Sequence, residues 1–460
     1  MKRIFMLFVL FCSACSLAPE YHRPAVDAPK AFSGGLFVKA KPADDLPKGA
    51  WWKIYTDESL DNLESQLEGN QDLKAALSRL SQAQSALKAQ RALLFPQVNV
   101  GAVSQKINTS QNRATYFRGI PYRYSDNLLT ADVSYEPDVF GRLANQVAVA
   151  RQQMESSKAD LATLRLSLQA ELAADYFTLQ ALRRQQAALR NLAENEDQYL
   201  KLTRALYEGG AVPEADVDEA EIALQNAKAQ EQDAELQAQT LIHAIALLLG
   251  KPATGFSVHT ENGEPRPWAV ISLPSRLLER RPDIASSERQ VEAANAAIGV
   301  ARAAYFPEFT LSAQGGFESG QMANLIATPS ELWSLGAGAM VNLFDAGLRK
   351  ALTEEARARY TETVANYRQS VLNAYREVED SLSAIRQLEL EDKSGESALQ
   401  SASRAADQAG FRYQGGMASY LDVVTAQIQV AQAKQQLALL QGRRMTASVL
   451  LVKALGGGPR

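Results

Sequence analysis

Apolar and polar residues alternate along four short stretches of this chain. The stretches cover residues 98–102, 130–136, 309–317 and 335–343. Alternation with a period of two predicts strands that have one apolar and one polar face. With their flanking residues the stretches are about 9 to 11 residues long, which is the length of a tilted strand that crosses a bilayer. The pattern therefore predicts two hairpins of membrane-spanning length.

Polar, Gly-rich segments separate the strands within each hairpin. They cover residues 105–126 and 318–331, and we expect both to be loops. Long polar loops at one end are typical of the extracellular side of an outer-membrane barrel. Two soluble hairpins, each packing its apolar face on a core, remain the alternative, because barrel signals are weak in each segment.

Most of the remaining chain has the composition of long helices. Residues 142–207 contain no Gly or Pro and are rich in helix formers. At about 1.5 Å per residue, a helix of this length reaches roughly 100 Å. Residues 348–413 are similar and are interrupted only by Gly395 and Gly410. Apolar residues there recur at steps of 4 and 3 between 371 and 385, which indicates coiled-coil packing.

The chain contains the same unit twice. The sequence around Tyr207 recurs around Tyr413, an offset of 206 residues, and residues 91–96 recur at 302–307, an offset of 211. A repeat of this size is much longer than a solenoid period of about 20 to 50 residues. We also expect return helices that end at 249–250 and 455–456, and shorter helices over 60–94 and 281–305. The predicted divisions are 15–59 (N-terminal segment), 60–250 (first repeat), 251–280 (Pro/Gly-rich crossover), 281–457 (second repeat) and 458–460 (tail).

Four strands cannot form a closed membrane barrel alone, since single-chain barrels have at least about eight. An open sheet in lipid would leave edge N–H and C=O groups unpaired, at a cost of several kcal/mol each. If the strands cross a membrane, several subunits must therefore share one barrel. Geometry alone allows any closed ring of two or more chains.

The N-terminus has the pattern of a bacterial lipoprotein signal. Lys2 and Arg3 precede an apolar run over residues 4–11, which is too short to span a bilayer, and small residues lead to Cys15. This predicts a signal peptide over 1–14 and a lipid on Cys15. Cys12 occupies a position where such signals usually have Leu, and the alternative is an ordinary signal peptide with a free Cys15.

Composition excludes several classes of function. The net charge is −4, which argues against a nucleic-acid partner. After cleavage only one of the two cysteines would remain, so no disulfide could form within the chain. His22, His243 and His259 are not spaced for metal binding, and we find no nucleophile motif and no phosphate-binding loop. We therefore expect no enzyme activity, no metal site and no cofactor besides the N-terminal lipid.

Several ordered motifs resemble the outer-membrane efflux protein family (TolC-like), and within it the lipoprotein branch typified by OprM and NodT. They cover residues 15–24, 138–142, 280–284 and 306–307. The resemblance implies a mainly α-helical fold with a membrane β-barrel, in which a trimer forms a twelve-stranded barrel that continues into a twelve-helix periplasmic α-barrel. It also implies an outer-membrane location, a periplasmic adaptor (membrane fusion protein) and an inner-membrane transporter of the resistance-nodulation-division (RND) class.

The family closes its channel just past the turn between the long helices. The matching positions are Asp216 and Glu219 in the first repeat and Leu421, Asp422 and Thr425 in the second. The family often has a second Asp where this chain has Thr425. In a ring, close carboxylates would repel, raise one another's pKa and attract cations. The alternative for Asp216 and Asp422 is a carboxylate stabilised by a helix N-terminus.

The same resemblance assigns adaptor docking to the turns themselves. The turn residues are Tyr207, Gly209, Gly210, Tyr413, Gly415 and Gly416. Paired glycines suit a turn that requires positive φ. The function implied is a passive exit duct of a tripartite pump that exports drugs or other small toxic compounds. An outlet for type I protein secretion and a lipid-anchored coiled-coil scaffold without a pore are the alternatives, and the sequence does not name the cargo.

Overall fold

The computed structural model describes residues 16–26, 31–32, 35–36, 49–114, 119, 121–260 and 281–457. The predicted signal peptide, Cys15, the tail 458–460 and most of the crossover 251–280 lie outside the described residues. The short elements are β1 (Ala31–Phe32), β2 (Gly35–Leu36) and the 3₁₀ helices η1 (Trp51–Tyr55), η4 (Met322–Asn324) and η5 (Thr328–Ser330).

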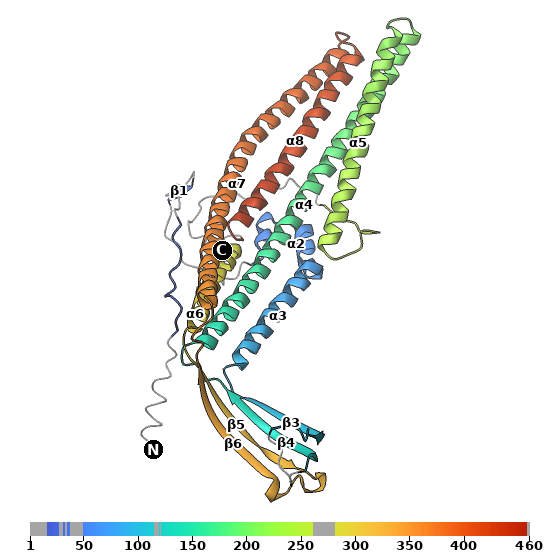
Figure 1. Ribbon diagram of the computed structural model, residues 1–460. Helices are drawn as coiled ribbons and strands as arrows, with labels where there is room; N and C mark the ends of the chain where they lie inside the picture. The colour runs from blue at the N-terminus through green and yellow to red at the C-terminus, as the bar shows by residue number, and fades with distance from the viewer. Residues whose placement is uncertain are drawn as a thin grey trace. The chain divides into compact units, whose positions relative to one another are not determined.

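The four predicted strands form one antiparallel sheet in the order β3-β4-β5-β6 (Figure 1). They are β3 (Gln97–Asn108), β4 (Arg123–Tyr135), β5 (Glu308–Ser319) and β6 (Glu331–Met340). The central pairing joins β4 of the first repeat to β5 of the second, with Val133 opposite Ala313. Strands β3 and β6 are therefore the two edges of this sheet.

The first hairpin extends further than its apolar pattern indicated. Residues from 105 onwards, predicted as a loop, remain paired as far as Asn108 and Arg123. Polar cross-strand contacts extend the ladder, because Gln105 hydrogen-bonds Asp126 at 3.2 Å and the Arg123 guanidinium donates to Asn108 at 3.1 Å.

The last strand, by contrast, is shorter than its pattern indicated. Strand β6 was expected to reach residue 343 but ends at Met340, which lies opposite Glu308, the first residue of β5. The residue before Glu308 is Pro307, which has no N–H to donate to a ladder, so the pairing ends there.

The long helices match in length between the repeats. Helices α4 (Arg142–Glu208) and α7 (Leu348–Gln414) have 67 residues each, and α5 (Glu214–Leu248) and α8 (Tyr420–Ala454) have 35 each. Every boundary in the second repeat lies 206 residues after its counterpart. Gly395 and Gly410 lie within α7 and do not interrupt it.

The shorter helices α3 (Gln71–Ala92) and α6 (Pro282–Ala303) have 22 residues each and are offset by 211, as are β3 and β5. The continuous helix expected from residue 60 is instead broken into α2 (Glu58–Ser65), η2 (Leu67–Gly69) and α3. The Asn70 side chain causes the break, because it accepts a hydrogen bond from the Leu73 N–H at 3.0 Å and thereby starts a new helix.

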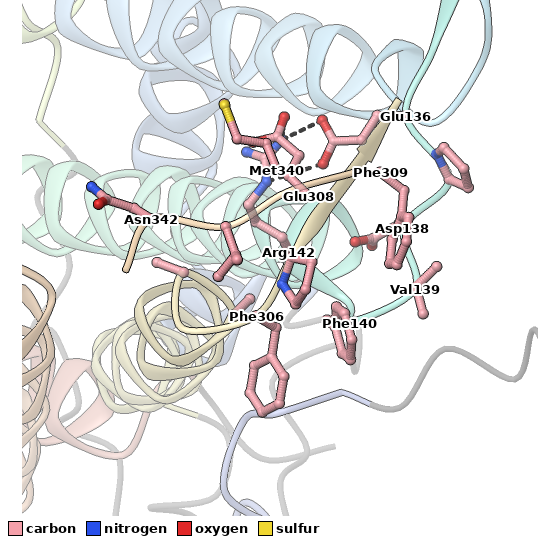
Figure 2. A pocket seen from close by; sticks show the side chains of 15 residues that line it. Glu136, Asp138, Val139, Phe140, Arg142, Phe306, Glu308, Phe309, Met340 and Asn342 are labelled. Atoms are coloured by element: carbon pink, nitrogen blue, oxygen red, sulfur yellow. Dashed lines mark hydrogen bonds and ion pairs between the residues drawn. The ribbon is translucent and has the colours of Figure 1, made fainter. Parts of the chain in front are cut away.

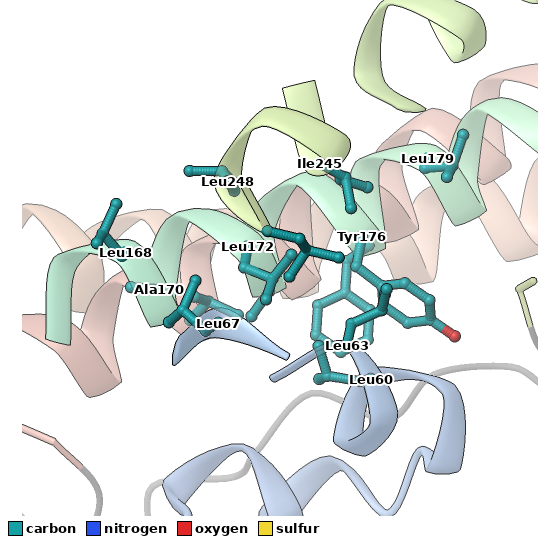
Figure 3. Packing of buried hydrophobic residues seen from close by; sticks show 14 of the residues in the cluster. Leu60, Leu63, Leu67, Leu168, Ala170, Leu172, Tyr176, Leu179, Ile245 and Leu248 are labelled. Carbon is teal, nitrogen blue, oxygen red and sulfur yellow. The ribbon is translucent and has the colours of Figure 1, made fainter. Parts of the chain in front are cut away.

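The chain divides into two compact units, which we describe separately. The first comprises the described residues among 1–25, 79–158 and 286–368, including the sheet, and the second those among 26–78, 159–285 and 369–460. The main hydrophobic core lies in the second unit, where α2 packs on α4 and α5 (Figure 3). Tyr176 and Phe177 are its largest fully buried side chains.

None of the helices in the described residues has a stretch that is both long and apolar enough to span a membrane.

Candidate functional site

The two turns between long and return helices have the same backbone. The N–H of Gly209 donates to the C=O of Ala205, and 206 residues later the N–H of Gly415 donates to the C=O of Phe411. The next residues, Gly210 and Gly416, have φ angles of 73° and 71°. This left-handed conformation favours glycine and ends a helix. Tyr207 and Tyr413, in the last turns, are 42% and 46% exposed.

The return helix α8 begins with a reciprocal capping box. The Ser419 hydroxyl accepts a hydrogen bond from the Asp422 N–H at 3.2 Å, and the Asp422 carboxylate accepts one from the Ser419 N–H at 2.8 Å. The hydrogen bond from the Ser419 hydroxyl, then that from its N–H, holds the pKa of Asp422 below the ordinary value of an aspartate. Asp422 is therefore an exposed carboxylate that is ionised at neutral pH.

Leu421 and Thr425 continue the first turns of α8. Thr425 is exposed, and its hydroxyl donates to the C=O of Leu421 at 2.9 Å. Leu421 is half-buried, whereas Val423 and Val424 are buried. Asp422 and Thr425 thus lie on the exposed side of the helix, while the two valines pack inward.

The first tip presents its carboxylates differently. Helix α5 begins after Pro213, which has no side-chain group to cap it. Burial, followed by the negative charges of Asp216, Glu196 and Glu219, raises the pKa of Tyr199. Asp216 and Glu219 therefore lie close to the Tyr199 hydroxyl on α4. In the described part of the chain, no hydrogen bond or ion pair joins the carboxylates of the two tips.

Tyr420 is a tip residue that sequence reasoning missed. Its hydroxyl donates to the Gln198 side chain of α4 at 3.0 Å, which links the start of α8 to the first repeat. Its ring also lies 5.3 Å from that of Tyr413. The available signal was an aromatic residue at the first helical position, directly before Leu421 and Asp422.

The second group of motif residues lines a cavity of about 580 Å³ where the strands meet the helices (Figure 2). The Arg142 guanidinium donates to the Glu136 carboxylate at 3.1 and 2.5 Å. The Asp138 carboxylate accepts a hydrogen bond from the Ala144 N–H at 2.6 Å, and the Phe140 ring stacks on Phe306 with centroids 4.6 Å apart. These contacts fix how β4 passes into α4 and beside α6, so the motifs are structural.

Within the described residues, no group of three or more His, Cys, Asp or Glu side chains is arranged to hold a metal ion.

Comparison with known proteins agrees with this architecture. The family described as outer membrane efflux protein matches residues 62–251 and 273–457. The pyoverdine export outer membrane protein OpmQ of Pseudomonas aeruginosa is 31% identical over 98% of this chain and 95% of its own length. Outer membrane protein OprJ of the same species is 30% identical, with the same coverage. The solved outer-membrane channel OprN has a TM-score of 0.83 and 29% identity, covering 96% of this chain and 99% of its own.

The chain therefore belongs to the outer membrane efflux protein family. The predicted fold class is confirmed as a duplicated, mainly helical chain with four strands, the fold of outer-membrane channels. The protein is an outer-membrane channel component of an efflux system that extends into the periplasm, and it is not an enzyme.

Proposed function

We propose that three copies of the chain form one channel, with a twelve-stranded barrel in the outer membrane and a twelve-helix tunnel in the periplasm. The observation that carries the proposal is the open sheet, in which β3 and β6 are edge strands. Unpaired edges cost several kcal/mol for each exposed group in lipid, so β6 of one copy would pair with β3 of the next. Four strands from each of three copies exceed the minimum of about eight.

The exposure of the edge strands supports this assembly. Eleven of the twelve side chains of β3 are exposed, and so are nine of the ten of β6. Several are large and apolar, including Val100 at 74% and Leu335 at 76%. Apolar side chains with this exposure suit a surface that faces lipid or another subunit.

The duct works without chemistry on its cargo. A periplasmic adaptor and an RND-type transporter would deliver small toxic compounds to its periplasmic end, and the cargo would leave passively. The relative named for pyoverdine export supports a small-molecule cargo over a secreted protein. The adaptor would dock on the turns around Tyr207, Gly209 and Gly210 and around Tyr413, Gly415 and Gly416.

The gate would lie at the tips of the return helices. Asp422, with Leu421 and Thr425 beside it, would form the main ring, and Asp216 and Glu219 would form a second acidic ring. The exposed, ionised carboxylate of Asp422 supports a cation-selective constriction. Its capping bonds to Ser419 would hold the carboxylate in place, so capping and gating are compatible roles.

The gate is tested by Asp422→Ala in planar bilayers. We expect a higher leak conductance and weaker cation selectivity, because both the charge ring and the cap are lost. The matched control is Asp218→Ala, which removes an exposed carboxylate near the other tip but outside the proposed rings. Equal conductance in the two folded variants would rule out the gate. Native mass spectrometry in detergent tests the trimer, and a stable single subunit would rule it out.

The lipid on Cys15 and the boundaries of the repeats, 60–250 and 281–457, complete the proposal. Mass spectrometry of the mature N-terminal peptide measures acylation directly.

A further inference from the structure

The first described residues form an extended segment that is held on the first unit. Residues 16–25, which we call the tether, contain no helix or strand. The tether follows directly after Cys15. The Ser16 hydroxyl donates to the Asn145 side chain of α4 at 2.8 Å. The tether is therefore attached next to the start of α4, one turn from Gly141.

Most of the other contacts of the tether fall on one stripe of α6. Arg23 forms an ion pair with Glu288 at 3.1 Å, Asn295 donates to the C=O of Pro19 at 2.8 Å, and Arg302 donates to the C=O of Leu17 at 3.2 Å. Residues 288, 295, 299 and 302 are spaced by 7, 4 and 3, which places them on the same face of a helix. The tether runs antiparallel to α6 along this face.

The lengths of the two segments match. From residue 288 to 302 a helix rises about 21 Å, at about 1.5 Å per residue. From residue 17 to 23 an extended chain spans about 20 to 22 Å, at about 3.3 to 3.6 Å per residue. The tether is thus close to fully extended between its contacts and has little slack, so the position of Arg23 determines that of Leu17.

Gly299 is the point where the tether comes closest to α6. A Cβ built on Gly299 would lie 2.8 Å from the backbone nitrogen of Ala18 and 2.7 Å from the Asn145 side chain. Real Cβ atoms do not approach a backbone atom so closely. The glycine therefore leaves room for the tether, which any larger residue would displace.

The other end of the tether is held by α7. The Arg23 guanidinium donates to the Tyr367 hydroxyl at 3.0 Å, and Arg368 donates to the C=O of Ala25 at 3.1 Å. Glu288, the ion-pair partner of Arg23, is buried, and so is the hydroxyl of Tyr21. A buried, paired charge fixes the segment more firmly than an exposed ion pair would.

Exposed apolar side chains occur at all four strand–helix junctions of the same unit. Phe95 precedes β3, Val139 follows β4, Phe306 precedes β5, and Phe344 follows β6, with exposures of 67%, 46%, 42% and 85%. We call these four residues the junction belt. Aromatic residues gather at the interface between a membrane and water, and the belt directly adjoins the strands.

We propose that the docked tether holds the acylated Cys15 at the level of the junction belt, so that the anchor and the belt enter the periplasmic leaflet of the outer membrane together. Leu17 is bonded to the last turn of α6, and Phe306 follows that turn by three residues. Two more residues reach Cys15, which is at most about 7 Å of extended chain. The inference rests on the proposed acylation of Cys15.

The docking is tested by digesting the mature lipoprotein in detergent with chymotrypsin. Cleavage between Tyr21 and His22 releases the peptide 15–21, and mass spectrometry measures both its rate of release and its acyl groups. Gly299→Ala should raise the rate at least about tenfold, because cleavage follows the population of the opened segment. The control is Gly410→Ala, since a Cβ on this other helical glycine would meet no atom within 4 Å.

Arg302→Ala removes a hydrogen bond to the tether without adding atoms, and it decides the question if Gly299→Ala does not fold. Equal release from both variants and the control overturns the docking. A peptide that is protected but carries no acyl group shows instead that the proposed anchor is wrong, and the shared membrane level falls with it.

The membrane level is tested with a bimane label on Phe344→Cys in lipid nanodiscs. Lipids with a nitroxide near the headgroup should quench this label. They should not quench the same label on Phe411→Cys, which is 71% exposed in the last turn of α7. Absence of quenching at residue 344, as a contact between subunits would produce, overturns the assignment of the belt.

Discussion

The two repeats have helices of equal length, but different side chains hold their ends. Helices α4 and α7 share a length of 67 residues, and α5 and α8 share 35. The backbone hydrogen bonds of both tips also repeat at an offset of 206. Helix lengths and turns have therefore been retained, while the polar groups that satisfy the helix ends have diverged.

The clearest divergence lies where each return helix ends. The Asn70 side chain, directly before α3, donates to the C=O of Leu248 at 2.8 Å. Arg281, directly before α6, donates to the C=O of Ala454 at 3.0 Å. Both carbonyls are at the end of a return helix and are 206 residues apart. Arg281 additionally binds Asp283 and Glu377, each at 2.7 Å.

The difference at these positions teaches that one structural requirement can have two chemical solutions. A helix end needs donors for its last carbonyls. An amide satisfies the requirement in the first repeat. A guanidinium does so in the second and also ties the start of α6 to α7. The following predictions test the comparison from the largest expected effect to the smallest.

Removing the donor should cost more in the second repeat. Arg281→Ala should lower the free energy of unfolding by about 2 to 3 kcal/mol, because it leaves a buried C=O unpaired and removes charged hydrogen bonds. The partly exposed carboxylates keep the value in this range. Asn70→Ala should cost about 1 to 2 kcal/mol. Denaturant titration of the assembled channel measures both, and equal losses would contradict the divergence.

Replacing the positive-φ glycines should have the same effect at both tips. Gly210→Ala and Gly416→Ala should each cost about 1 kcal/mol, since an alanine is strained in the left-handed region. Hydrogen exchange of the two turns measures the local opening. A clear inequality between the tips would show that their backbones are not equivalent.

Loss of the Tyr420 hydroxyl should loosen only the second tip. Tyr420→Phe removes the hydrogen bond to Gln198, a net change of about 0.5 to 1.5 kcal/mol, and should raise the open probability of the proposed gate by roughly twofold to tenfold. Single-channel recording measures it. Tyr413→Phe retains a neighbouring ring and serves as the control, and a matching rise in that variant would argue against a specific link.

Acidification should affect the second tip first. Because the pKa of Asp422 is lowered in the folded protein, its contribution to the cap is present above the ordinary aspartate pKa and is lost as the pH falls through the lowered value. Pro213 has no side-chain cap to lose. We expect faster amide exchange at the start of α8 than at the start of α5 when the pH is reduced from 7 to about 3. Equal changes would contradict this.

Much of the fold could be predicted from periodicity and from the repeat. The four strands and the long helices were expected close to their observed positions, because alternation and uninterrupted runs of helix formers are local signals. The break at Asn70 was missed, since it depends on that side chain capping a new helix next to a distant carbonyl. The extension of the first hairpin was missed because polar cross-strand contacts stabilise it.

The candidate site was less accessible to sequence reasoning. The glycine turns were identified from their repetition, and Asp422 was identified from its family position. The bond from Tyr420 to Gln198 joins residues 222 positions apart, so no local pattern contains it. The docking of the tether on α6 was missed for the same reason, although the spacing of Glu288, Asn295, Gly299 and Arg302 is visible once the partner segment is known.

The change of offset from 211 to 206 has a practical consequence. Five residues are gained or lost between the first strand of a hairpin and the long helix, yet every later helix boundary stays in phase. Evolution has thus already carried out a length-changing experiment at this place. A short epitope tag inserted between β3 and β4 should leave the periplasmic machinery unaltered and provide a handle on intact cells.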